Sequence, residues 1–214
     1  MADSITNTIE NERAVGFKDI FLASVFQNDA SIYSVSNTVE LARAISGKLT
    51  EKVTTTTYYS NDVIESVNTS ITGVSLELEV NALSPMMQST ILGKKLINGI
   101  LATNSQDTAN QTAISFRIKN TKGLYEFYQM YDVVFETEGK SFKTLADKEK
   151  DETIKIKGTC TPMVKTGDYY ISVNEQYLLE GDTDAKAAIA TWSSKVQIRS
   201  DIINPLVISK PVTA

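Results

Sequence analysis

The stretch Val74-Ser75-Leu76-Glu77-Leu78-Glu79-Val80 alternates strictly between apolar and polar residues. Successive side chains of a β-strand point to opposite faces of a sheet, so this alternation predicts a strand with one buried face. The four apolar residues are expected to face a core, and Ser75, Glu77 and Glu79 to point away from it. The surrounding fold is therefore expected to be built from β-structure.

Further strands are predicted on both sides of this stretch. Residues 53–59 are rich in threonine and tyrosine, and β-branched and aromatic residues favour a pleated surface. Residues 114–119 alternate again and, across a turn at 120–123, are expected to form a hairpin with residues 124–136. Residues 39–49 are ambiguous, because their own propensity favours a helix whereas their neighbours favour β-structure. The remaining predicted strands are residues 20–26, 153–157 and 168–173.

Two short helices are predicted. Ser84 suits an N-cap, Pro85 the first helical position and Gly93 the C-terminal stop, which indicates a helix after the central strand. The alanine-rich residues 182–192 predict a second, C-terminal helix. The fold class that follows is mainly β, a sandwich or barrel with these two helices and with extended N- and C-terminal arms.

The chain of 214 residues divides into three predicted parts. Residues 1–14 form a polar N-terminal arm, residues 15–175 the β domain, and residues 176–214 a C-terminal extension with a short helix and an arm. With 42% hydrophobic and 22% charged residues, the composition is that of a folded domain. No secretory signal or membrane span is expected, because the N-terminus is polar and no apolar run approaches about 20 residues.

The chain contains no histidine and a single cysteine, Cys160. Histidine is the usual general acid or base near neutral pH, so its absence excludes Ser-His-Asp and Cys-His catalysis and most transition-metal sites. Only a carboxylate- or lysine-based enzyme would be compatible with this composition. Neither a glycine-rich phosphate loop nor a nucleophile elbow is present. We therefore expect no enzyme activity, no catalytic residue, no cofactor and no metal, and Cys160 is expected to be a small buried apolar residue.

Charge and aromatic content bear on nucleic-acid binding. The formal net charge is −5, which disfavours a surface that grips phosphates. A set of aromatic residues occupies both faces of one predicted strand; it could stack on bases, but without interleaved Arg and Lys it is expected to pack a core and an interface. The set comprises Tyr125, Phe127, Tyr128, Tyr131 and Phe135.

Four motifs follow one another between Gly16 and Val173. They are the opening Gly16-Phe17-Lys18-Asp19-Ile20; the threonine run that leads into Tyr58-Tyr59-Ser60-Asn61-Asp62; the alternating strand that continues through a short helix to Leu92-Gly93; and the closing Thr159-Cys160-Thr161-Pro162. In order and spacing the chain resembles the major tail proteins, or tail tube proteins, of long-tailed siphophages. It departs from that family at Tyr59-Ser60-Asn61-Asp62, where the family usually has Tyr-Ala-Asp-Asn, and in the stretch after Val173.

The resemblance implies a tail-tube-type β-sandwich or barrel whose subunits close into six-fold rings. The rings stack into a hollow tube, and the inner strands of all subunits form one continuous β-barrel. The acidic outward face of the central strand would suit a lumen that DNA traverses without sticking. The residues implied are Glu77 and Glu79 for the lumen, and Tyr58, Tyr59, Ser60, Asn61 and Asp62 for a loop that reaches the neighbouring ring.

The resemblance also implies partners and a location. The main partner is the chain itself, in homo-hexameric rings, with a tape measure protein inside the tube and tail terminator and distal tail proteins at its ends. DNA would pass through without specific binding, no membrane would be involved, and the protein would be made in the host cytoplasm and reside in the virion tail. The alternatives are another tail component or a secretion-system tube protein of the same fold, or a stand-alone β-sandwich module that binds a carbohydrate or protein ligand.

Overall fold

The computed structural model describes residues 13–60, 62–137 and 153–199. Within them the chain is mainly β, as predicted, and both predicted helices are present. Most of the two predicted arms lies outside the described residues. The elements are β1 (Ala14–Asn28), β2 (Tyr33–Val35), β3 (Val39–Ala42), β4 (Ala44–Ser60), β5 (Val63–Val80), α1 (Pro85–Leu92), β6 (Lys95–Ile97), β7 (Ile100–Ala102), β8 (Gln111–Asn120), β9 (Tyr125–Thr137), β10 (Ile154–Thr161), β11 (Tyr170–Asn174), a 3-10 helix (Glu175–Tyr177) and α2 (Thr183–Ala190).

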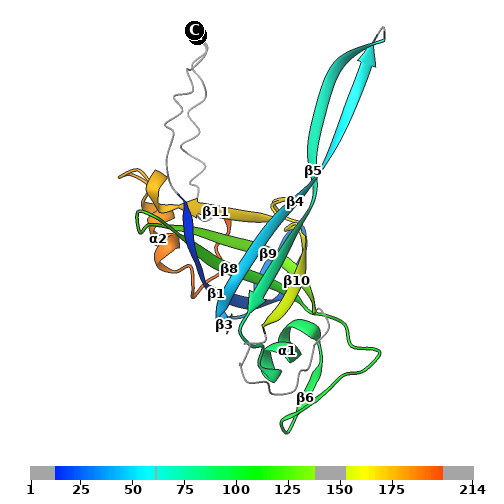
Figure 1. Ribbon diagram of the computed structural model, residues 1–214, viewed down its shortest axis with the longest axis vertical. Coiled ribbons are helices and arrows are strands. Elements are labelled where there is room, and N and C mark those ends of the chain that lie inside the picture. Colours follow the sequence, from blue (N-terminus) through cyan, green and yellow to red (C-terminus); the bar gives the residue numbers. More distant parts are fainter. Residues whose placement is uncertain (1–12, 61, 138–152, 200–214) are drawn as a thin grey trace, which may run out of the picture.

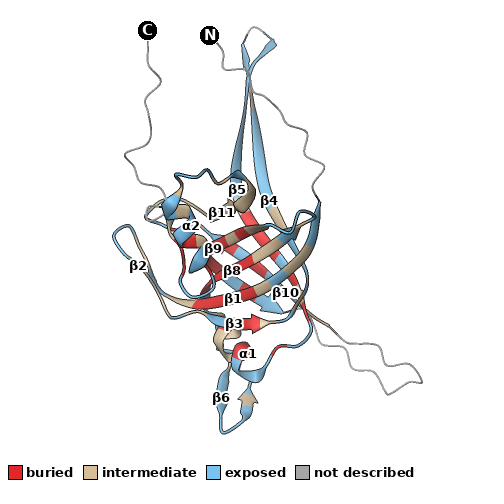
Figure 2. Cartoon of the chain, turned by 90° about the vertical axis from the view of Figure 1, so that its left-hand side faces the viewer, coloured by how far each residue is buried: buried red, intermediate tan, exposed pale blue. Residues whose placement is uncertain are grey.

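Nine of the described strands form one antiparallel sheet that closes on itself (Figure 2). Its main order is β2-β1-β8-β9-β10-β5-β4. β3 pairs with β1 and is separated from β4 by Arg43 alone, so one stretch of chain joins the two ends of the sheet. Of the sandwich and the barrel that the sequence left open, the structure is a barrel. Closure leaves fewer free edges than an open sheet of the same strands would expose.

The interior of the barrel holds the main core. Val74, Leu76, Leu78 and Val80 of β5 are each at most 2% exposed and face this core, which confirms the predicted inward face. Ser75, predicted to point away from it, is nevertheless 8% exposed, because β4 and β10 flank it on both sides. The period of two therefore predicted the face of each residue correctly but not its exposure.

Helix α1 lies at one end of the barrel (Figure 1). The Ser84 hydroxyl accepts a hydrogen bond from the Met87 backbone N–H at 3.2 Å. Gly93 ends the helix with φ of 67°, a left-handed conformation that favours glycine. Met87 and Ile91 insert into the barrel core. The predicted cap, first position and stop of this helix are all confirmed.

The C-terminal segment covers the outer face of β9. The rings of Phe127 and Trp192 lie 5.6 Å apart, and Ala188 of α2 packs beside them. The indole N–H of Trp192 donates to the carbonyl oxygen of Tyr128 at 3.0 Å. Both faces of the aromatic strand are therefore covered within the chain, and its buried residues include the polar Gln129 and Asp132 beside the aromatic ones. The described part of the predicted C-terminal extension packs against the β domain.

Strands β4 and β5 are 17 and 18 residues long and extend far beyond the barrel as a two-stranded hairpin (Figure 1). The ambiguous residues 39–49 lie in β3 and β4, where pairing with β1 and β5 overrides their helical propensity. The barrel thus carries one long projection at the end opposite to α1 (Figures 1 and 2).

Candidate assembly surfaces

The projecting half of the β4–β5 hairpin is supported by β4 and β5 alone within the described residues. β10 pairs with β5 only from Val74 to Val80, whereas β4 pairs with β5 as far as Ser60 and Val63. Almost every described residue from 53 to 72 is exposed. The outer edges of both strands therefore leave backbone groups without a sheet partner over this length, the kind of edge that can accept another strand.

The projecting hairpin has two chemically different faces. Residues directly opposite one another in an antiparallel pair share a face, so the register defines both. One face, here named the apolar hairpin face, has only β-branched and tyrosine side chains: Val53, Thr55, Thr57 and Tyr59 opposite Ile71, Thr69, Val67 and Ile64. The other, the polar hairpin face, consists of Thr54, Thr56 and Tyr58 opposite Ser70, Asn68 and Ser66.

The apolar hairpin face is open to solvent. Its large side chains are between 49% and 67% exposed, and they are Val53, Tyr59, Ile64, Val67 and Ile71. Along β4 this face continues the face that carries Leu49, which packs against the barrel core. Glu51 lies between Leu49 and Val53 on this side of β4 and accepts a hydrogen bond from the Tyr170 hydroxyl. Beyond Glu51 this side carries only β-branched and tyrosine side chains, and nothing in the described chain covers them.

The structure places the predicted inter-ring residues at the end of this hairpin and corrects their conformation. Tyr58, Tyr59 and Ser60 belong to strand β4 and not to a loop, because Tyr58 pairs with Ser66 and Tyr59 with Ile64 across a bulge. Asp62 lies in the turn with φ of 61°, and Asn61 lies outside the described residues. The two tyrosines point to opposite faces of the hairpin. Their inter-ring role stays a prediction.

The predicted lumen residues lie on the outer face of the barrel. Glu77 is opposite Lys48 on β4 and Lys157 on β10, and Lys157 is in turn opposite Glu136 on β9. Glu79 is opposite Lys155 on β10. This charged face, defined by Lys48, Glu77, Glu79, Glu136, Lys155 and Lys157, thus balances three lysines against three glutamates. The acidic character expected of it is a property of β5 alone.

Hydrogen bonds hold one of these carboxylates in its ionised form. The Thr153 hydroxyl donates to Glu79 at 2.5 Å, and the Ser46 hydroxyl donates to it at 3.0 Å. Both bonds lower the pKa of Glu79, the one from Thr153 the most. Glu79 is therefore negatively charged at neutral pH. The charged face as a whole has little long-range field, because neighbouring charges of opposite sign cancel within a few ångströms.

A second exposed hairpin, which the sequence reasoning missed, lies next to α1 at the opposite end of the molecule (Figure 1). β6 and β7 pair with each other across Asn98 and Gly99, which have φ of 50° and 81°. Positive φ at both central residues defines a type I′ turn, and Asn-Gly between apolar residues is its strongest sequence signal. The sequence contains this signal at Asn98-Gly99, between Ile97 and Ile100. With the exposed end of α1, this hairpin forms the α1 pole, defined by Met86, Lys94, Lys95, Leu96, Ile97 and Ile100.

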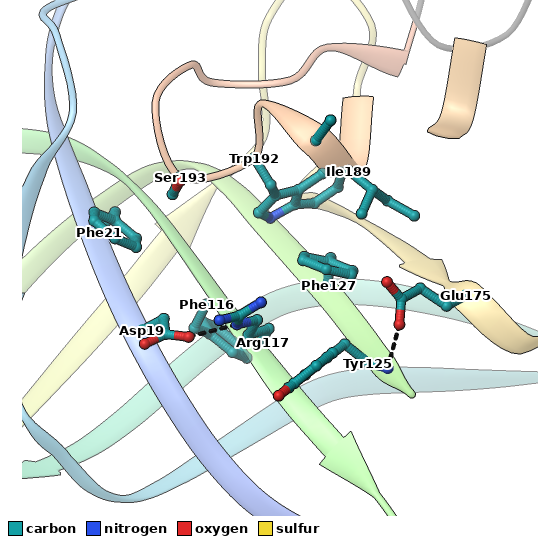
Figure 3. Close-up of a pocket in the computed structure, with 11 residues that line it drawn as sticks. Asp19, Phe21, Phe116, Arg117, Tyr125, Phe127, Glu175, Ile189, Trp192 and Ser193 are labelled. Carbon is teal, nitrogen blue, oxygen red and sulfur yellow. Dashed lines mark hydrogen bonds and ion pairs between the residues drawn. The ribbon is translucent and has the colours of Figure 1, made fainter. Parts of the chain in front are cut away.

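A pocket of about 470 Å³ lies between α2 and the barrel (Figure 3). Arg117 forms an ion pair with Asp19, and its guanidinium lies 4.4 Å from the centre of the Tyr125 ring. Glu175 accepts the backbone N–H of Tyr125 at 2.7 Å, and Trp192 forms part of the wall. Both carboxylates link neighbouring elements: Asp19 joins β1 to Arg117 of β8, and Glu175 joins the 3-10 helix to β9. The pocket is a seam between α2 and the sheet.

Cys160 lies within the barrel core at 3% exposure, as predicted for a small apolar residue. Burial raises the pKa of its thiol to about 12. A thiol with that pKa carries almost no thiolate at neutral pH, so Cys160 is a poor nucleophile.

No group of three or more Cys, Asp or Glu that could hold a metal ion occurs in the part of the chain that the structure describes. Nor does any helix in that part have the length and apolar character needed to cross a membrane.

Comparison with known proteins gives no match: no family model and no curated protein sequence matches the chain. The function of this chain is therefore inferred from the surfaces described above.

Proposed function

We propose that this chain is a structural subunit that assembles with copies of itself into stacked rings, expected to be hexameric, and that the rings form a hollow tail tube for the passage of phage DNA. The single observation that carries the proposal is the uncovered apolar hairpin face, with five large side chains at 49% to 67% exposure. The expectation of stacked six-fold rings that form a tube comes from the resemblance of the motif order to that of siphophage tail tube proteins.

The projecting hairpin is a poor structure for a monomer. An isolated two-stranded hairpin is marginally stable in water and gains stability when it is packed against another surface. Covering each half-exposed aliphatic side chain of the apolar hairpin face would contribute about 1 to 2 kcal/mol. A contiguous exposed apolar surface with free strand edges marks an interaction site or an aggregation liability. A subunit that always assembles gains from such a surface, whereas a stand-alone ligand-binding module does not.

The hairpin also favours a head-to-tail assembly. It projects from one end of the barrel only, so a contact with a different surface of the next copy is heterologous. Heterologous contacts close into rings or continue as filaments, and a stacked-ring tube uses both kinds. The apolar hairpin face begins at Val53, just beyond Glu51 on the core-facing side of β4, so covering it would form a second apolar core, shared between copies, next to the barrel.

The charged face suits the wall of a conduit, with Glu77 and Glu79 as candidate lumen residues. Balanced charges neither hold DNA nor repel it over long distances, so DNA can pass without specific binding. In this proposal a tape measure protein would occupy the lumen before DNA passage, and tail terminator and distal tail proteins would close the ends.

Assembly of the purified protein tests the proposal. We expect rings or tubes in negative-stain micrographs, and a mass in light scattering that rises with protein concentration. Val67→Asp with Ile71→Asp, on the apolar hairpin face, should leave monomers only. The matched control, Asn68→Asp with Ser70→Asp, adds the same charges one position away on the polar hairpin face and should assemble.

Two outcomes would contradict the proposal. One is a wild-type chain that stays monomeric at every concentration and salt, which would favour the stand-alone module. The other is equal assembly of both double variants, which would show that the apolar hairpin face is not a contact. Because all four positions are exposed in the monomer, circular dichroism of each variant should match the wild type. Tubes whose rings are not six-fold would point to another tail component or a secretion-system tube of the same fold.

A further inference from the structure

We propose that the tip of the β4–β5 hairpin of one copy binds the α1 pole of the next copy, with Asp62 and Glu65 facing Lys94 and Lys95. This inference rests on the proposed self-assembly and names the two surfaces that meet. The hairpin tip is defined here by Tyr59, Asp62, Ile64 and Glu65, and the α1 pole is the surface defined above.

The first argument is charge. Residues 53–72 contain two acidic residues, Asp62 and Glu65, and no basic residue. Residues 83–110 contain Lys94 and Lys95 and a single acidic residue. That residue, Asp107, uses its carboxylate within its own loop, where it accepts the backbone N–H of Asn104 at 2.7 Å. The hairpin tip is thus acidic and the α1 pole basic, which is the complementarity that fixes the partner of an interface.

The second argument is the apolar surface that accompanies each charged pair. At the hairpin tip Tyr59 and Ile64 are directly opposite each other and are 67% and 56% exposed. At the α1 pole Ile97 and Ile100 are directly opposite each other and are 62% and 71% exposed. In the two-residue period of β6, Lys95 lies on the same face as Ile97. Each surface therefore combines an exposed apolar pair with charges of one sign.

The third argument is position. The hairpin tip and the α1 pole lie at opposite ends of the molecule in both views (Figures 1 and 2), so one copy cannot bring them together. A contact between two hairpin tips would place Asp62 and Glu65 against themselves, and a contact between two α1 poles would do the same with the lysines. Like charges facing each other suppress both symmetric contacts. The remaining arrangement is head to tail, and it repeats from copy to copy.

Charge reversal with mixing tests this contact. Asp62→Lys with Glu65→Lys makes both ends of the chain basic, and Lys94→Glu with Lys95→Glu makes both ends acidic. Each variant alone should need at least about a tenfold higher concentration than the wild type to form tubes, because like charges then meet at every contact. An equimolar mixture should assemble near the wild-type concentration, because each hairpin tip then meets an α1 pole of opposite charge.

A disulfide test locates the same contact in the wild-type charge background. Copies with Ile64→Cys and copies with Ile100→Cys, mixed under assembly conditions and oxidised, should give a crosslinked dimer on a non-reducing gel. The control pairs Asn68→Cys, on the polar hairpin face, with Ile100→Cys and should give none. Cys160 should not interfere, because it is buried in the barrel core.

The outcomes separate the two proposals. A wild-type chain that never assembles overturns self-assembly and this contact together. A wild-type chain that assembles while both charge variants assemble equally well overturns only the contact with the α1 pole. The contact is also overturned if both variants fold by circular dichroism but their mixture stays unassembled. Restoration by mixing supports the contact and shows that both variants are folded.

Discussion

The two halves of β5 have the same alternating pattern of side chains and opposite environments. In the half within the barrel, Leu76 and Leu78 are 1% and 2% exposed, whereas in the projecting half Val67 and Ile71 are 58% and 49% exposed. Along β5 both halves alternate apolar or β-branched residues with polar ones. The difference is that residues of the same chain cover the half within the barrel, whereas no described residue covers the projecting half. Alternation therefore predicts which face of a strand is apolar, but not whether the surface that covers it belongs to the same molecule.

The largest expected effect tests this difference through stability. Leu78→Ala should lower the free energy of unfolding by about 2 to 5 kcal/mol, because it opens a cavity in the barrel core. Val67→Ala should change it by less than about 0.5 kcal/mol in the dilute monomer, because the side chain stays exposed on folding. Urea unfolding at a concentration below assembly measures both. Equal losses would show that the projecting half is packed in the isolated chain.

A smaller effect concerns the barrel alone and comes from pH. Burial raises the pKa of the Cys160 thiol to about 12 and also raises the pKa values of Tyr33 and Tyr128. The unfolded chain releases these protons at lower pH than the folded chain does. The stability that they contribute is therefore present below about pH 9 and is lost as the pH rises toward 12 and above.

Urea midpoints measured at increasing pH test this loss. Tyr33→Phe removes one of the contributing groups, whose hydroxyl donates to the carbonyl oxygen of Tyr131 at 2.5 Å, so its midpoint should fall less steeply with pH than that of the wild type. An unfolding free energy that is constant from neutral to strongly alkaline pH would show that these groups are as accessible in the folded barrel as in the unfolded chain.

The smallest effect is expected on the charged face, which is solvent-exposed like the projecting hairpin although it belongs to the barrel. Glu77→Lys places a lysine between Lys48 and Lys157 and should cost no more than about 1 kcal/mol, because exposed charge pairs contribute little. With Glu79→Lys added, tubes should still form but DNA passage should be impaired. Glu77→Gln is the matched control without charge reversal. Loss of assembly instead would place these residues in a contact between subunits.

Some parts of the fold were predictable because their causes are local. Ser84, Pro85 and Gly93 delimit α1 through their own hydrogen bonds and backbone preferences, and the structure confirms all three roles. Residues 39–49 were ambiguous because their own propensity favours a helix whereas their neighbours favour β-structure. Pairing with β1 and β5 makes them strands. The β6–β7 hairpin was missed although Asn98-Gly99 predicts it locally, so that omission came from the interpretation and not from any lack of signal.

The candidate surfaces were less predictable because they combine distant parts of the chain. Glu77 and Glu79 appeared as an acidic face when β5 was considered alone, but Lys48, Lys155 and Lys157 come to the same face from neighbouring strands. Tyr58 and Tyr59 lie in β4, as the propensity of residues 53–59 predicted, and not in the loop that the resemblance implied. The balance of charge, in contrast, does not follow from spacing within one segment, since it depends on cross-strand register.

The sequence by itself determined the β class, the inward face of the central strand, both helices and the exclusion of histidine chemistry, because each depends on residue type or on a short period along the chain. Only the tertiary structure decided that the sheet closes into a barrel, that the charges of its outer face balance, and that the apolar hairpin face lies open to solvent. Those features depend on which strands lie side by side, and the free energy of that arrangement comes from contacts between residues far apart in the sequence.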